Sequence, residues 1–220
     1  METQNPNPFP AAPIDDPAID DWELAWEKHK KTILAAAAAI AVAGIAIFVW
    51  WINSTLTNEA AEKLLAEATG IEGYRAVVEK YPRSMPAADA LLLLAAAHRE
   101  DGDLPASTAA FQEFLQKFPA HELAGGALLG VGQNQDASGD EKGAIATYQQ
   151  VVTQFPDSYA APFAAYCEAE LLLRSFQREE ARRSFNMVTS RYPQSAAARM
   201  AANQLSRLGA QPQQQSQPGQ

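Results

Sequence analysis

The chain has 220 residues and a formal net charge of −9, from 17 basic and 26 acidic residues. An acidic chain without basic clusters argues against nucleic-acid binding, which depends on neutralising phosphates with Lys and Arg. Its single cysteine, Cys167, excludes an intramolecular disulfide, and its three histidines lack metal-ligand spacing. No convergent set of catalytic side chains stands out. We therefore expect no catalytic residue, no metal and no cofactor, and do not expect an enzyme.

Residues 1–27 are expected to form an acidic, mostly disordered tail. Five prolines fall within the first seventeen residues, a composition that disfavours a packed core. Asp21–Lys31 could form a short helix that places Trp22 and Trp26 on one face. Both interfacial anchoring and partner binding remain open for that helix.

Residues 28–54 are expected to form a transmembrane anchor. Thr32–Ile52 comprises 21 residues without a charge, which at about 1.5 Å per residue spans roughly the 30 Å of a bilayer's hydrocarbon core. Trp26 and Trp50-Trp51 fit aromatic belts at the two interfaces. A core helix of a soluble domain would normally show a polar stripe. A cleaved signal peptide would have a shorter apolar region and a small-x-small site.

The charges that flank this segment predict its orientation. Lys28, Lys30 and Lys31 precede it, whereas only Lys63 lies within the next fifteen residues. Because basic residues favour the cytoplasmic side, we expect the amino terminus in the cytoplasm and the rest of the chain outside. Retention of the segment would make the lipid bilayer a partner of the chain through one helix.

An aromatic-proline pair recurs every 37 residues, at Tyr81-Pro82, Phe118-Pro119, Phe155-Pro156 and Tyr192-Pro193. Further positions repeat in the same register. A small residue, a large aromatic four later and an apolar residue three after that share one helix face; the aromatics are Tyr74, Phe111, Tyr148 and Phe185. Ser84, Ser158 and Ser195 follow their prolines and can cap the next helix, with His121 in the remaining place. This pattern predicts an all-α solenoid of helical pairs.

The register divides residues 55–209 into units. We expect a lone second helix around Gly70–Tyr81, three complete pairs between about Ser84 and Arg191, and a half-unit around Ser195–Leu208. The third unit departs from the pattern, because Glu168 stands where its siblings have Leu94 and Val131. Residues 210–220 read as a flexible polar tail, rich in glutamine.

With Ala95, Gly132 and Ala169 twelve residues before the small position, this ladder resembles the tetratricopeptide repeat. That resemblance implies a concave surface lined by first helices, on which proteins bind. The matching groove positions are Asp89, Leu92 and Arg99 in the first pair, Leu129, Gln133 and Asp136 in the second, and Phe163, Tyr166, Glu170 and Arg174 in the third. Each of them could equally be ordinary surface.

The longer repeat, with Tyr/Phe-Pro-x-Ser before an alanine-rich helix, looks like those of the YbgF and BamD families of the bacterial cell envelope. The whole architecture, a short tail, one retained helix and external repeats, resembles the YfgM-like family, an ancillary subunit of the SecYEG translocon. That resemblance implies a single-pass protein of the bacterial inner membrane with periplasmic repeats. Its partners would be translocon subunits, exported chains or periplasmic chaperones. The alternative is a scaffold for outer-membrane assembly or for cell-wall and division machinery.

Overall fold

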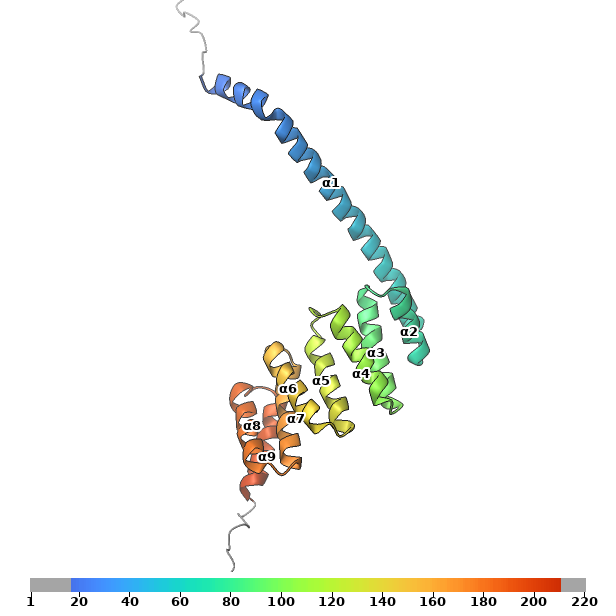
Figure 1. The fold of residues 1–220 in the computed structure, drawn as a ribbon, viewed down its shortest axis with the longest axis vertical. Coiled ribbons are helices and arrows are strands. Elements are labelled where there is room, and N and C mark those ends of the chain that lie inside the picture. The colour runs from blue at the N-terminus through green and yellow to red at the C-terminus, as the bar shows by residue number, and fades with distance from the viewer. Residues whose placement is uncertain (1–16, 211–220) are drawn as a thin grey trace, which may run out of the picture. The chain divides into compact units, whose positions relative to one another are not determined.

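The computed structural model describes residues 17–210, which form helices joined by short turns and contain no strand (Figure 1). This confirms the all-α fold expected from the repeat. The helices are α1 (Pro17–Glu67), α2 (Gly70–Lys80), α3 (Met85–Glu100), α4 (Leu104–Lys117), α5 (Ala124–Ala137), α6 (Glu141–Gln154), α7 (Ala160–Arg174), α8 (Arg178–Arg191) and α9 (Ala196–Ala210). Most of the proline-rich tail and all but the first residue of the expected carboxy-terminal tail lie outside the described residues.

Helix α1 runs without a break for 51 residues. It begins at Pro17, earlier than the expected start at Asp21, and proline is tolerated in a first turn because the N–H that it lacks would have no partner there. Its apolar part, within Lys28–Glu67, is long and apolar enough to cross a membrane, and its side chains are exposed. Length and composition fit a membrane anchor, and signal sequences share both properties.

The contacts divide the chain between Ser54 and Thr55. The second unit contains the end of α1 together with α2 to α9. Leu64 and Leu65 of α1 pack against the same apolar cluster as Val77 of α2. The expectation of a lone second helix at Gly70–Tyr81 is therefore wrong, because α1 supplies its partner. The periodicity missed this helix since α1 enters the unit directly, without the aromatic-proline turn that precedes the other first helices.

Helices α3 to α8 form the three expected pairs and α9 the final half-unit, each helix packing against the next. The residues after the prolines cap the first helices: Ser84 Oγ accepts from the Ala87 N–H at 3.2 Å and Ser195 Oγ from the Ala198 N–H at 3.0 Å. His121 takes the same role, because its Nδ1 accepts from the Leu123 N–H at 3.1 Å.

Small residues let the helices of the core approach closely. A Cβ added at Gly130 would lie 2.6 Å from the Phe111 ring, and one added at Gly132 would lie 2.7 Å from the Tyr148 ring. Glycine's low helix propensity, a cost approaching 1 kcal/mol, is therefore offset by the packing of these aromatic rings. Tyr148 is only 1% exposed, as the repeat predicts.

Two side chains differ in burial from the expectation. Phe111 was expected to be buried like Tyr148, but it is half-buried, and the Arg99 guanidinium lies 5.5 Å from its ring centroid. His98 was expected on a helix flank, but it is buried in α3. In both cases the contacts of the neighbouring helix decide the exposure, which periodicity alone does not report.

Candidate functional site

The ten predicted groove residues lie on α3, α5 and α7, the first helices of the three pairs. Helix α5 also contacts α7, and α7 contacts α9. We call α3, α5, α7 and α9 the first-helix row. Polar side chains join each helix of this row to the next, so several predicted residues meet in pairs although they lie more than thirty positions apart in the sequence.

Arg99 joins α3 to α5. Its Nε donates to Asn134 Oδ1 at 2.8 Å, and its two terminal nitrogens donate to Gln133 Oε1 at 3.0 Å and to the Gly130 carbonyl at 2.8 Å. All three acceptors are uncharged. Burial lowers the pKa of Arg99 from its ordinary value, and the nearby Tyr148 partly opposes that effect.

Asn134 is a residue that the sequence did not single out. It is almost fully buried, and its amide nitrogen donates to Ser107 Oγ at 2.9 Å and to Thr108 Oγ1 at 3.1 Å, both on α4. Its carbonyl oxygen accepts from Arg99, so it connects the first-helix row to the second helix of the preceding pair. Buried amides need such partners. Its repeat equivalents Ala97 and Leu171 are apolar, and that contrast was the available signal.

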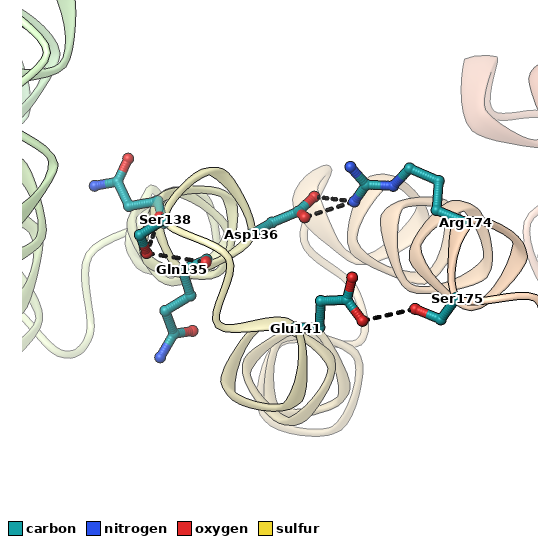
Figure 2. A network of polar contacts seen from close by, with 7 residues as sticks. Gln135, Asp136, Ser138, Glu141, Arg174 and Ser175 are labelled. Atoms are coloured by element: carbon teal, nitrogen blue, oxygen red, sulfur yellow. Dashed lines mark hydrogen bonds and ion pairs between the residues drawn. The ribbon is translucent and has the colours of Figure 1, made fainter.

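Asp136 and Arg174 join α5 to α7. Both carboxylate oxygens of Asp136 accept from one Arg174 nitrogen, at 2.5 and 2.7 Å. Figure 2 shows these side chains pointing toward each other, with Ser175 donating to Glu141 beside them at 2.8 Å. The hydrogen bond to Asp136 raises the pKa of Arg174. The Arg174 side chain is still 60% exposed, so solvent screens the pair.

Glu170 joins α7 to α9. Its Oε1 accepts from Tyr166 Oη at 2.7 Å and from Gln204 Nε2 at 2.5 Å. Burial raises the pKa of Tyr166, and the bond to Glu170 adds to that effect. Gln204 was not predicted as a site residue, because its repeat equivalents Leu93, Gly130 and Cys167 share no chemistry with it.

The remaining predicted residues do not join these bridges. Leu129 and Tyr166 are only 9% and 8% exposed, so they serve mainly as core. Leu92 and Phe163 are half-buried against the two apolar clusters. Asp89 is exposed and instead borders a cleft of about 450 Å³ at the α1 end of the repeat unit, lined by Asn58, Glu62, Leu65, Ala66, Met85, Pro86 and Asp89. The predicted groove thus presents a largely polar, internally paired surface.

Two further groups concern reactivity. Burial, with help from the nearby Glu170 and Asp136, raises the pKa of the Cys167 thiol to about 11, so the unreactive thiol form dominates at neutral pH. Within residues 17–210, no three His, Cys, Asp or Glu side chains are grouped so that they could hold a metal ion.

Comparison with known proteins identifies the repeat. Residues 89–121, 127–158 and 165–195 match the tetratricopeptide repeat family. A tetratricopeptide repeat protein from Parabacteroides merdae is 17% identical, with a TM-score of 0.51 over 71% of this chain and 60% of that one. The MamA protein is 14% identical, with a TM-score of 0.50 over 71% of this chain and 82% of its own. No curated protein sequence matches significantly.

These similarities establish the fold of this part of the chain, because the matched segments coincide with the three helical pairs. The expected tetratricopeptide architecture is therefore confirmed. The chain spans less than two thirds of the Parabacteroides protein, and at such low identity neither structure carries over a partner.

Proposed function

We propose that this chain, whose three matched tetratricopeptide repeats follow an exposed apolar helix, is a membrane-anchored scaffold that binds other proteins. The observation that carries the proposal is this order along the chain, an apolar span of α1 followed at once by helical pairs. A repeat solenoid offers an extended surface rather than an enclosed site. Such an arrangement suits positioning of proteins near a membrane, and it requires neither a catalytic residue nor a cofactor.

In the preferred version, the scaffold is a YfgM-like accessory factor of the Sec translocon in the bacterial inner membrane. Its repeats would lie in the periplasm, where they hold exported proteins or dock chaperones. The lysines that precede the apolar span support this orientation. The alternative is an envelope scaffold for outer-membrane assembly or for cell-wall and division machinery, supported by the likeness of the repeat motifs to YbgF and BamD.

The first-helix row is the proposed binding surface. It presents charges of both signs, Arg99 and Arg174 beside Asp136 and Glu170, already paired with one another. A ligand with a single strong charge would have to break these pairs, whereas a mixed polar and apolar peptide can add contacts at the half-buried Leu92 and Phe163. This favours extended protein segments as ligands.

Crosslinking in intact membranes tests the proposal. A photoreactive residue at Leu92 should capture proteins, and Leu92→Asp should lower capture by neighbouring probes because it places a charge where apolar contact is expected. Leu129→Asp and Tyr166→Asp are unsuitable, because both side chains are largely buried and their loss would report unfolding. Gln112→Asp, on the exposed face of α4, is the matched control. Gln149 is less suitable as a control, because it donates to Glu168.

The captured proteins distinguish the two versions. Translocon subunits and nascent exported chains support the preferred one, and outer-membrane assembly or cell-wall factors support the alternative. Equal loss of capture in Leu92→Asp and Gln112→Asp, with both variants folded, would place binding outside the first-helix row.

A further inference from the structure

The turns between the two helices of each pair share one backbone feature and differ in one residue. Gly102 and Gly139 adopt positive φ angles of 79° and 84°, and Phe176 adopts 59° at the equivalent place, since 139−102 and 176−139 both equal 37. Glycine adopts this conformation freely, whereas a side chain with a Cβ is disfavoured there. The third turn therefore carries a strained aromatic where its siblings carry glycine.

Packing within the chain does not offset this strain. Phe176 is 95% exposed, the highest value among the large hydrophobic side chains of the described residues. A strained residue with an unburied ring is better explained by a contact outside the chain than by the fold. The ring projects from a turn flanked by two exposed arginines, Arg174 and Arg178. It therefore forms an apolar knob beside positive charge.

The cleft at the α1 end of the repeat unit has complementary properties. Leu65, Ala66, Met85 and Pro86 give it apolar walls, and the exposed Glu62 and Asp89 give it negative charge. Its volume of about 450 Å³ falls in the range of roughly 300–1,000 Å³ typical of sites that enclose small molecules, so one phenyl ring fits. Met85 is 54% exposed although it lies beside apolar walls.

The knob and the cleft cannot meet within one molecule. Helices α7 and α8 contact α5, α6 and α9, and among the described residues they make no comparable contact with α1 or α3. A complementary pair at two different places on one surface produces a heterologous interface, in which each copy uses its knob on one neighbour and its cleft on another.

We propose that Phe176 of one copy inserts into the cleft between α1 and α3 of a second copy, with Arg174 and Arg178 next to Glu62 and Asp89. Copies then associate head to tail. A single-ring contact is small and hence weak, but anchoring in a membrane would raise the effective concentration of the copies. The association does not depend on which protein the first-helix row binds.

Disulfide trapping with the full chain in phosphatidylcholine vesicles tests this contact. One chain carries Gln177→Cys, next to the knob, and another carries Ala66→Cys, in the cleft; both also carry Cys167→Ala to remove the native thiol. We expect a disulfide-linked dimer when the two chains are mixed. Gln177 makes no capping hydrogen bond through its side chain and Ala66 is exposed, so both cysteines should be tolerated. An exposed position on α4, Gln116→Cys, replaces Gln177→Cys as the control for random collision.

Phe176→Gly in the Gln177→Cys chain separates the knob from the fold. It restores the glycine of the sibling turns, so the helices should form normally, and the yield of the mixed dimer should fall about ten-fold or more through loss of a buried ring. Glu62→Lys in the other chain should also lower the yield. A yield no higher than that of the Gln116→Cys control, or a yield that Phe176→Gly leaves unchanged, would overturn the proposal. Flotation of the vesicles checks the anchor separately.

Discussion

At the scale of the residue, equal positions in the repeat are not equally buried. The aromatic position is fully buried at Tyr148 and Phe185 but half-buried at Tyr74 and Phe111. The register predicts that the ring faces its neighbours, and the bulk of those neighbours then decides how much water it meets. Mutational effects should follow burial rather than register.

Tyr148→Ala should lower the free energy of unfolding by about 3–5 kcal/mol, because it opens a cavity beside Gly132, which cannot fill it. Phe111→Ala should cost clearly less, since water already reaches its ring. Denaturant unfolding of the two variants checks the order. Equal losses would show that burial does not separate these two positions.

Glu168 predicts a pH dependence. Burial raises the pKa of its carboxyl, opposed in part by the bond from Gln149, so the folded state binds a proton more readily than the unfolded state. Its contribution to stability is therefore full below the ordinary carboxyl pKa and is lost as pH rises through the raised value. Glu168→Gln should raise the melting temperature at neutral pH.

The difference between Glu168→Gln and the unsubstituted chain should disappear as the pH falls toward about 4, near the ordinary carboxyl pKa. Glu113→Gln, on α4, is a control outside this environment. A melting temperature that Glu168→Gln leaves unchanged across the whole pH range would contradict the assignment of the shift to this group.

At the scale of the element, polar bridges fix neighbouring first helices. Asp136 and Arg174 join α5 to α7 in an exposed pair. A double-mutant cycle of Asp136→Ala and Arg174→Ala should give a coupling of about 0.2–1 kcal/mol, the range of exposed ion pairs. Unfolding at low and high salt checks it, and the coupling should shrink at high salt because ions screen the pair. A coupling that high salt leaves unchanged would mean that the pair does not act through its charges.

The turns of the pairs make a second prediction at this scale. Gly139→Ala should cost about 1–2 kcal/mol, because alanine is disfavoured at a positive φ angle. Phe176→Gly should cost nothing or stabilise slightly, since relief of strain is set against the greater freedom of glycine in the unfolded chain. Thermal unfolding of both variants checks the contrast, and a large loss in Phe176→Gly would show that the ring supports the fold.

At the scale of the whole molecule, the proposed topology predicts protease sensitivity. With the amino terminus in the cytoplasm and a retained anchor, protease added to spheroplasts should digest the repeats and spare the amino-terminal tail. An epitope at each end reports the two sides separately, and a cytoplasmic protein controls for lysis. Protected repeats in intact spheroplasts would rule out the proposed orientation.

The sequence by itself determined the repeat. A 37-residue register in aromatic-proline pairs, small residues and caps predicted three helical pairs and a final half-unit, because side chains at i, i+4 and i+7 must share a helix face. Placement of the ten predicted residues on α3, α5 and α7 follows from the same register. Local periodicity suffices for such features, since they depend on neighbours within a few turns.

Only the tertiary structure decided what these residues touch. Leu129 and Tyr166 were predicted as groove residues but are largely buried, and Arg99 meets Gln133 and Asn134 across more than thirty positions of sequence. The pairing of α2 with the end of α1 likewise lacked any signal in the register. Burial and long-range hydrogen bonds depend on how one helical pair stacks on the next, and that stacking is a property of the assembled solenoid rather than of any single repeat.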